Sequence, residues 1–353
     1  MKIAITGAGL IGRIMGLSLL RDYSDCQIDF YEKFLHPSSK DSCGYAAGGM
    51  VAPFCELMEN NLQLYQLGVK SIAAWQSINK QLNYDVFQHN GTLVLAHCYD
   101  QPDFFHLYNK LMQYDAIDKK QIDLLPTNKY TKDNNISGLN TALFHQCIRI
   151  KNEGVVNVPL FFRKTEEFFA MAKNINFYLN KEIAENDLTH LQQKYDYIID
   201  TRGLGAQNAI KGLHGIRGES LVVKAPDVTI DKTIRLCHPR YPLYVIPRKN
   251  NIYYIGATTI QSQDDSNISV KSTMDLLSAL TVIHPGFLEA RILQSFSRNR
   301  PSFPSGMPKT AISGNIITLN GFYRHGYLLG PVIVDNVINK HILEKQYECA
   351  KQS

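Results

Sequence analysis

The chain has 353 residues, of which 44% are hydrophobic and 20% are charged. At roughly 100–200 residues per domain, this length predicts two domains or one large two-lobed unit, and the composition excludes a disordered or fibrous chain. Lys and Arg number 37 and Asp and Glu number 32, which leaves a formal net charge of +5. No run of five or six basic residues concentrates that charge, so the sequence carries no footprint of nucleic-acid binding.

The seven cysteines are scattered and include no CxxC pair. Their spacing favours neither a disulfide framework nor a zinc site, and we expect no metal centre. Gly7 and Gly9 interrupt the apolar start of the chain, which is not the pattern of a signal peptide, and no stretch approaches the roughly 18 apolar residues of a membrane span. We therefore expect a soluble protein of a reducing compartment, the cytoplasm.

The first residues have the pattern of a dinucleotide-binding unit. An apolar run over 2–6 ends in the sequence GAGLIG, which opens an apolar helical stretch. In a strand–turn–helix unit of this kind, Gly7 permits the sharp turn, Gly9 lets a pyrophosphate approach the backbone, and Gly12 lets the helix pack closely on the sheet. The unpaired N–H groups at the helix start then face the phosphates.

A second apolar segment, 27–31, ends in Glu32, twenty residues after Gly12. A carboxylate at this position can accept hydrogen bonds from the hydroxyls of an adenosine ribose and would repel a 2′-phosphate. The motif alone does not distinguish FAD from NAD. Residues 41–53, however, are nearly all small until Met50. This favours a backbone packed against the flat ring system of a flavin over a flexible loop, because Ala and Met are not typical of flexible linkers.

The rest of the chain alternates between helical and strand-like periodicity. Trp75 lies in a predicted helix and is expected in the core, and residues 100–140 read as polar surface helices and loops with little chemistry. We predict helices over 62–80, 159–172 and 332–343, and strands within 88–96, 195–200, 219–224, 243–247, 252–257 and 316–319.

These elements predict an α/β (α+β, two-lobed) fold: a Rossmann-like dinucleotide-binding domain with an inserted antiparallel or mixed β-sheet domain for substrate. We expect the cofactor domain over 1–82, 148–212 and 298–345, the substrate domain over 83–147 and 213–297, and a tail over 346–353.

The sequence resembles the D-amino-acid oxidase-like family of FAD-dependent enzymes, and within it the glycine oxidases of thiamine (thiazole) biosynthesis. The similar segments occur in the family's order and span nearly the whole chain. They are GAGLIGRIMG (7–16), YEK (31–33), YAAGGMVAPFCE (45–56), HNGTLVLA (89–96), DTRGLGA (200–206), GIRGES (215–220), RLCHPRYPLYVIPR (235–248), IGAT (255–258), LLSALTVIHPGFLEARI (276–292), RPSFPSGMP (300–308) and NGFYRHGYLLGP (320–331).

The resemblance implies non-covalent FAD and a substrate cavity between the two lobes. Matched residue by residue, the implied FAD contacts are Gly7, Gly9, Leu10, Ile11, Gly12, Glu32, Lys33, Gly48, Gly49, Met50 and Ile183, with Phe322, Tyr323, His325, Gly326, Tyr327 and Leu328 at the isoalloxazine edge. Arg300 matches the arginine that clamps the substrate carboxylate, Tyr244 lines the cavity, and Arg324 lies beside the same carboxylate. His325 is expected to contribute its backbone N–H rather than its ring.

The activity implied by the resemblance is oxidative deamination of glycine or a similar small amine. Hydride passes to flavin N5, dioxygen reoxidises the flavin to give hydrogen peroxide, and the imine either hydrolyses to a 2-oxo acid or feeds thiazole synthesis. No side chain is nominated as a catalytic acid or base, because the flavin performs the chemistry. The implied partners are a small amino acid and dioxygen, within a homo-oligomer, with neither nucleic acid nor a membrane.

Several alternatives stay open from the residues alone. The protein could be a D-amino-acid or sarcosine oxidase, a dehydrogenase that passes electrons to a quinone, or a flavin-binding protein without turnover. Arg324 could instead form a structural ion pair, and Tyr244 could be plain core. Two positions depart from the family pattern, Gln261 after IGAT and Asn299 before Arg300. Both bear on the shape of the pocket and hence on the substrate.

Overall fold

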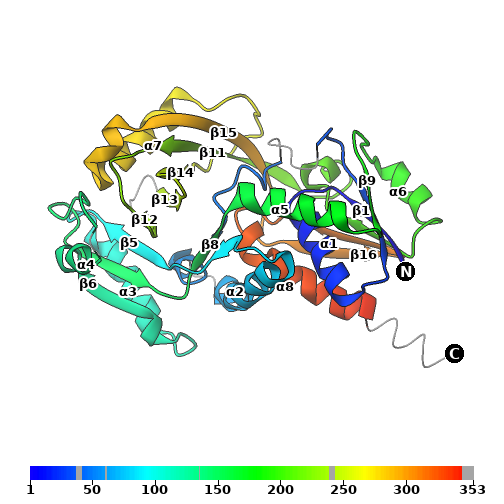
Figure 1. Ribbon diagram of the computed structural model, residues 1–353, viewed down its shortest axis with the longest axis horizontal. Helices are drawn as coiled ribbons and strands as arrows, with labels where there is room; N and C mark the ends of the chain where they lie inside the picture. Colours follow the sequence, from blue (N-terminus) through cyan, green and yellow to red (C-terminus); the bar gives the residue numbers. More distant parts are fainter. Residues whose placement is uncertain (37–41, 60–61, 135, 238–242, 344–353) are drawn as a thin grey trace.

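The computed structural model describes residues 1–36, 42–59, 62–134, 136–237 and 243–343. Two lobes lie side by side, each built around its own β-sheet (Figure 1). One sheet has six strands and the other eight, and a small three-stranded sheet of β3 (Met50–Val51), β8 (Gly154–Val156) and β4 (Phe87–Gln88) lies near their junction. The predicted α/β fold with a second sheet domain is confirmed.

The six-stranded sheet contains the predicted dinucleotide-binding unit. Its order is β16 (Lys309–Ser313), β17 (Ile316–Asn320), β10 (Tyr197–Asp200), β1 (Lys2–Thr6), β2 (Gln27–Tyr31) and β9 (Ile175–Tyr178). All pairs are parallel except β16 with β17. The carboxyl ends of the parallel strands therefore meet at one edge, where ligands bind in folds of this type.

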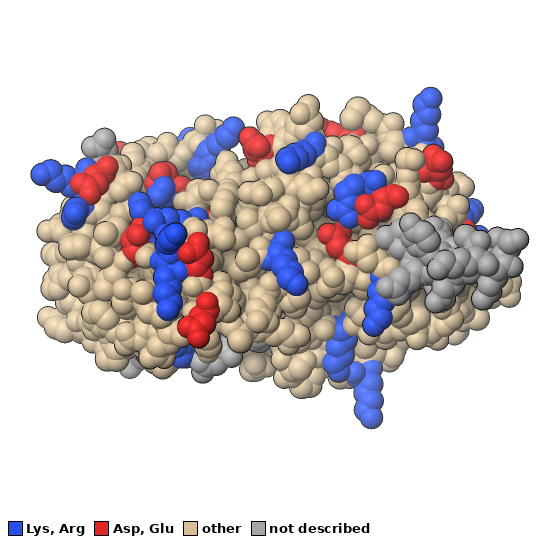
Figure 2. All heavy atoms as spheres, turned by 90° about the horizontal axis from the view of Figure 1, so that it is seen from below, with Lys and Arg blue, Asp and Glu red and all other residues tan. Residues whose placement is uncertain are grey.

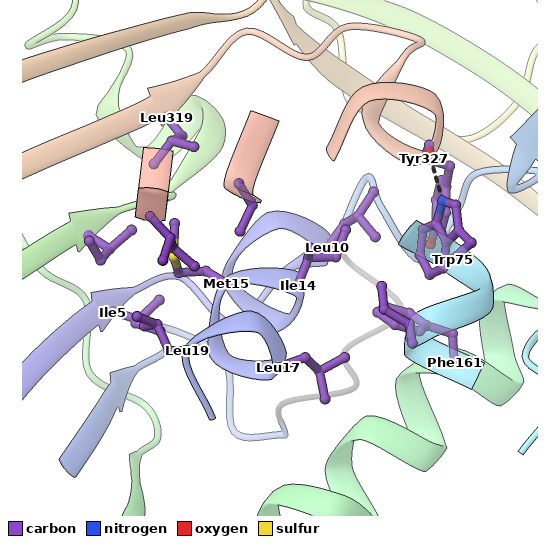
Figure 3. Packing of buried hydrophobic residues seen from close by; sticks show 14 of the residues in the cluster. Ile5, Leu10, Ile14, Met15, Leu17, Leu19, Trp75, Phe161, Leu319 and Tyr327 are labelled. Carbon is purple, nitrogen blue, oxygen red and sulfur yellow. Dashed lines mark hydrogen bonds between the residues drawn. The ribbon is translucent and has the colours of Figure 1, made fainter. Parts of the chain in front are cut away.

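Helices cover this sheet and form its core. They are α1 (Leu10–Asp22), α2 (Leu62–Leu82), α5 (Val158–Met171), α6 (Glu185–Leu191) and α8 (Gly326–Ile338). Figure 3 shows α1 surrounded by buried apolar side chains, with Ile14 and Met15 fully buried. The indole N–H of Trp75, also fully buried, donates to the carbonyl of Tyr327 at 2.7 Å and so fixes the start of α8. Trp75 is a core residue, as predicted.

The eight-stranded sheet carries the other lobe. Its order is β15 (Arg291–Ser302), β11 (His214–Lys224), β14 (Ile252–Gly256), β13 (Leu243–Arg248), β12 (Thr233–Cys237), β5 (Thr92–Ala96), β7 (Gln146–Ile150) and β6 (Ile122–Pro126). One face packs against α7 (Val270–Ile283) through residues such as Val245 and Leu280. Because side chains alternate along a strand, Tyr244 and Tyr254 lie on the other face, which is turned toward the first lobe.

Two segments differ from the sequence-based expectation. The polar segment 100–140 holds α3 (Gln101–Gln113) and α4 (Thr127–Asp133), but also β6, a strand of the large sheet. Helix α8 begins at Gly326 instead of 332, so Gly330 and Pro331 lie inside it. A Cβ on Gly330 would lie 3.0 Å from the Ile14 side chain, so this glycine allows α8 to pack closely against α1.

On the face shown in Figure 2, Lys and Arg are interspersed with Asp and Glu between broad uncharged areas. The salt bridge between the exposed Arg291 and Glu289 also joins charges of opposite sign on the surface. Among the described helices, none combines the length and the apolarity that crossing a bilayer would need.

Candidate functional site

A cavity of about 690 Å³ runs from the carboxyl ends of β1 and β2 to the free face of the large sheet. The predicted site residues line it, although they come from segments far apart in the sequence. They are Gly7, Gly9, Leu10, Ile11, Glu32, Lys33, Gly48, Gly49, Met50, Ile183, Tyr244, Arg300, Phe322, Tyr323, Arg324, His325, Gly326, Tyr327 and Leu328. Gly12 lies behind this lining.

The glycine loop after β1 has the geometry of a phosphate-binding turn. Gly7 has a φ of +94°, and a Cβ there would lie 2.8 Å from the carbonyl oxygen of Thr201. At Gly12 a Cβ would lie 2.0 Å from the carbonyl oxygen of Gly7, so only glycine lets α1 approach the loop. A Cβ on Gly9 would have the Ser42 hydroxyl as its nearest neighbour, at 3.6 Å, so the loop is open toward the cavity at this residue. The first N–H groups of α1 therefore face open space.

Glu32 closes this end of the cavity. Its carboxylate accepts the backbone N–H of Ala8 at 2.7 Å and that of Phe34 at 3.2 Å, and the residue is only 7% exposed. A carboxylate has about four acceptor sites, so these two bonds leave capacity for ribose hydroxyls.

Arg202 lines the cavity together with Glu32 and Ile183, and the sequence analysis did not identify it. Its guanidinium donates to both carboxylate oxygens of Asp200 at 2.8 Å and to the carbonyl of Ile183 at 2.7 Å. Asp200 is the last residue of β10. Its ion pair with Arg202, together with the hydrogen bond from Arg202 to Ile183, therefore fixes the segment around Ile183 to the sheet. The only sequence signal was the position of Arg202 directly after a strand in the sequence DTRGLGA.

The small residues of 42–50 are held from behind by three long side chains. The hydroxyls of Tyr327 and Tyr254 donate to the carbonyls of Gly44 and Ala46 at 2.9 and 2.8 Å, and the Arg248 guanidinium donates to that of Gly48 at 2.6 Å. Desolvation lowers the pKa of Arg248 to about 10, so it stays charged at neutral pH. Gly49 has a φ of +80°, and a Cβ there would lie 2.3 Å from the carbonyl oxygen of Val156.

Arg300 lines the same cavity as the glycine loop. It is on β15, and its Nη1 donates to the carbonyl of Thr258 at 3.0 Å. A Cβ at Gly218 on the neighbouring strand would lie 2.1 Å from an Arg300 nitrogen, so the guanidinium lies flat over that glycine. Asn299, one of the departures from the family pattern, also lines the cavity, and its amide donates to the carbonyl of Gln263 at 2.8 Å. Gln261, the other, is exposed.

The turn before α8 joins the two lobes at the cavity. The N–H of Tyr323, a residue with a φ of +49°, donates to the carbonyl of Pro301 at 2.8 Å. The N–H of His325 was expected to face the flavin. It donates instead to the carbonyl of Phe322, within the turn, at 2.8 Å. The N–H groups of the first turn of α8, beginning at Gly326, have no partner within the helix and lie at the cavity.

Glu56 is a second residue that the sequence analysis missed. It lines the cavity, and its Oε2 lies 3.9 Å from Nη2 of Arg324 and 3.7 Å from Nδ1 of His325. Oε2 is buried and accepts no hydrogen bond from the described residues. Arg324 therefore has a carboxylate within ion-pair distance inside the cavity.

Behind Glu56 lies a buried acidic group formed by Cys55 and Glu153. The Cys55 N–H and thiol donate to the two oxygens of Glu153 at 2.9 and 3.4 Å. Burial raises the pKa of Glu153 to about 7 and that of the Cys55 thiol well above its ordinary value. A thiol with a raised pKa is a poor nucleophile, so we assign it no covalent role.

The buried His284 has structural partners away from the cavity. The ring of His284 accepts the N–H of Gly286 at 2.9 Å and lies 2.8 Å from the carbonyl of Ser137. His238 falls outside the described residues. Within the described part of the chain, no group of three or more His, Cys, Asp or Glu side chains could hold a metal ion.

The cavity fits FAD on the evidence of its own residues: an open glycine loop, the buried carboxylate of Glu32 beside it, and a wall of small residues in the same cavity as the Arg300 guanidinium. A family model described as DAO, FAD dependent oxidoreductase, matches residues 2–335. A candidate thiamine biosynthesis oxidoreductase ThiO of Rhizobium etli is 28% identical over 349 residues, or 98% of both chains.

Solved structures show the same fold. Glycine oxidase from Geobacillus kaustophilus matches with a TM-score of 0.75 at 19% identity, covering 95% of this chain and 93% of its own. Iminodiacetate oxidase from Chelativorans matches with a TM-score of 0.75 at 18% identity, covering 94% and 93%. The chain belongs to the DAO family of FAD-dependent oxidoreductases.

Proposed function

We propose that this FAD-dependent enzyme oxidises the amine of glycine or of another small amino acid. The observation that carries the proposal is the position of Arg300. Its guanidinium lies flat over Gly218 in the same cavity as the glycine loop. A guanidinium fork on a cavity wall is suited to a carboxylate, which it can bind through two parallel hydrogen bonds.

Arg300 orients the substrate. The carboxylate pairs with the guanidinium, which the carbonyl of Thr258 holds in place. With the carboxylate fixed, the Cα–H bond is directed across the cavity toward the small-residue wall of Gly48 and Gly49. Bound FAD supplies the electron acceptor and, with dioxygen, the route to hydrogen peroxide. Positioning of this kind lowers the barrier by removing translational and rotational freedom before the reaction.

The remaining residues of the site exclude water and supply charge. Tyr244 and Tyr254 cover the substrate end from the large sheet, and the turn at Tyr323 closes it from the other lobe. The first N–H groups of α8 present partial positive charge to the cavity, where negative charge on a ring edge is stabilised. We assign no general base, because an amine that enters neutral needs none.

The relatives support this choice of substrate. The Rhizobium etli relative is named for thiamine biosynthesis, and the Geobacillus kaustophilus neighbour is a glycine oxidase. The further proposal is therefore that the oxidised product of glycine serves thiazole synthesis.

The test is an anaerobic titration of the purified flavoprotein with glycine, sarcosine and D-alanine, followed through the flavin absorbance. Bleaching by one of the three, with recovery and peroxide when air is admitted, is the expected result. Bleaching without peroxide under air would instead make the protein a dehydrogenase. A flavoprotein that none of the three reduces would contradict the proposal and leave a flavin-binding role without turnover.

A further inference from the structure

A fully buried arginine lies directly behind the glycine loop. Every residue of α1 from Gly12 to Leu19 is buried, and Arg13 is the only charged residue among them. Its exposed fraction is 0%. Arginine is almost never buried in this way unless it is paired with an anion, so the surroundings of Arg13 should show what balances its charge.

The guanidinium of Arg13 has uncharged partners among the described residues. Its Nε donates to the carbonyl of Ala8 at 3.0 Å, and its Nη1 donates to the carbonyl of Phe162 at 3.0 Å and to the hydroxyl of Thr165 at 2.6 Å. The centre of the Phe162 ring lies 4.7 Å from the guanidinium carbon. Nη2 is buried and has no hydrogen-bond partner in the described part of the chain. These contacts satisfy donors, but none of them neutralises the charge.

Two other arginine side chains in the interior are balanced by a carboxylate. Arg202 pairs with Asp200 at 2.8 Å, and Arg217 forms an ion pair with Glu219. Within the described ranges Arg13 forms no such ion pair. Its charge therefore remains without a counter-ion from the protein.

Arg13 nevertheless stays charged at neutral pH. Burial lowers its pKa to about 10, and the carboxylates of Glu166 and Glu32 oppose this effect only in part. The Glu32 carboxylate is already engaged by the N–H groups of Ala8 and Phe34. In addition, a cation near the N-terminus of a helix is repelled by the helix dipole. Both effects make this position unfavourable for arginine unless an anion binds nearby.

The hydrogen bond from Arg13 to Ala8 connects this charge to the cavity. The Ala8 carbonyl belongs to the same peptide group as the N–H of Gly9, and Gly9 lines the cavity. Among the described residues the Gly9 N–H has no hydrogen-bond partner. Donation to a carbonyl polarises its peptide group, so the N–H on the other side becomes a stronger donor. An anion that accepts this N–H would also balance the charge of Arg13.

We propose that Arg13 is a buried counter-charge for the diphosphate of FAD, and that it acts through the Ala8–Gly9 peptide without touching the cofactor. Arg13 is thus a positioning residue: it holds the loop in shape and adds a whole positive charge to the partial charge of the α1 N-terminus. The inference concerns the cofactor and does not depend on which amine the enzyme oxidises.

The test is competition between FAD and either ADP or adenosine for the full-length protein, followed by flavin fluorescence. ADP contains the diphosphate and adenosine lacks it, so the ratio of their affinities reports on the diphosphate site. Wild-type protein should bind ADP more tightly than adenosine, and R13M should lower this ratio at least about tenfold, because a buried charge is little screened. R163M, which removes an exposed arginine from α5, should retain the wild-type ratio.

Two further variants separate the charge of Arg13 from its hydrogen bonds. R13Q keeps an N–H donor but removes the charge, so it should also lower the ratio at least about tenfold. R13K keeps the charge without the planar fork, so its ratio should stay within about threefold of wild type.

A structural role alone would weaken ADP and adenosine equally, so an unchanged ratio in R13M and R13Q would overturn the proposal. Wild-type protein that does not distinguish ADP from adenosine would overturn it as well. If R13M does not fold, the comparison of R13Q with R13K decides, and equal ratios in these two variants would contradict a role for the charge. No amine takes part in the experiment, so its result is independent of whether glycine reduces the flavin.

Discussion

The backbone N–H of Ala8 donates to the carboxylate of Glu32 at 2.7 Å, which ties the glycine loop after β1 to the end of β2. The two segments on which a dinucleotide would lie are therefore fixed to each other before any ligand binds. One carboxylate both holds the glycine loop in shape and lines the cavity where we expect the ribose. Its removal should damage both functions.

E32A should weaken FAD binding. Loss of the carboxylate removes the charged acceptor proposed for the ribose hydroxyls, and hydrogen bonds to a charged group contribute about 1.5–3 kcal/mol. This corresponds to a roughly 10- to 150-fold rise in the Kd of FAD, measured by fluorescence titration of the apoprotein. E289Q, at an exposed position, should retain wild-type affinity. Full flavin occupancy of E32A after dialysis would contradict the assignment.

R300M should raise the KM for the amine substrate steeply. Removing one member of a buried charge-assisted pair costs about 2–5 kcal/mol, chiefly in binding. R300K should recover part of the loss, because an ammonium keeps the charge without the planar fork. Steady-state kinetics check this, with R291M as the control on the same strand. An unchanged KM in R300M would remove Arg300 from the substrate site.

Glu153 should make the protein less stable as the pH rises from about 5 to 7. Burial raises its pKa in the folded state to about 7, against an ordinary value of 4.5, so the folded state holds a proton that the unfolded state has lost. By linkage the unfolding free energy falls through this window, by up to about 3 kcal/mol. Urea unfolding at pH 5 and pH 8 should show a smaller difference for E153Q than for wild type. If the unfolding free energy changes equally in the two proteins between pH 5 and pH 8, a group other than Glu153 causes the pH dependence.

G49A should be more destabilising than G306A, although both glycines have a positive φ, +80° and +68°. A Cβ at Gly49 would lie 2.3 Å from the carbonyl oxygen of Val156, whereas at Gly306 nothing lies within 4 Å. Overpacking of this kind costs about 1–3 kcal/mol beyond the backbone strain that both variants share. Denaturant unfolding of the two variants measures this difference in stability. Equal stabilities would show that the backbone at Val156 moves to accommodate the added methyl group.

The local part of the fold could be predicted from the sequence. The turn at Gly7, the close approach at Gly12 and the acidic end of β2 at Glu32 each depend on residues within a few positions of one another. Their physical requirements are visible as spacing. The order of these features along the chain was enough to predict a dinucleotide site and the elements that form it.

Long-range pairing could not be predicted in this way. Arg235, Arg202 and Glu56 reach the cavity only because strand order and register bring distant segments together. β12 lies beside β5, for example, which is 141 residues earlier at the pair Thr233 and Thr92. A single charged residue within an apolar strand has no periodicity to mark it. The role of such a residue depends on the residues that face it across the cavity, and these come from distant parts of the sequence.

The strand order of the six-stranded sheet also fixes when the cofactor lobe can be completed during synthesis. β10 lies between β1, at the beginning of the chain, and β17, which ends at Asn320. The whole eight-stranded sheet, up to Ser302, leaves the ribosome before β17 does. The lobe that begins first in the sequence is therefore finished last, and a chain that ends before Lys309 would contain the glycine loop but lack β16 and β17 of its sheet.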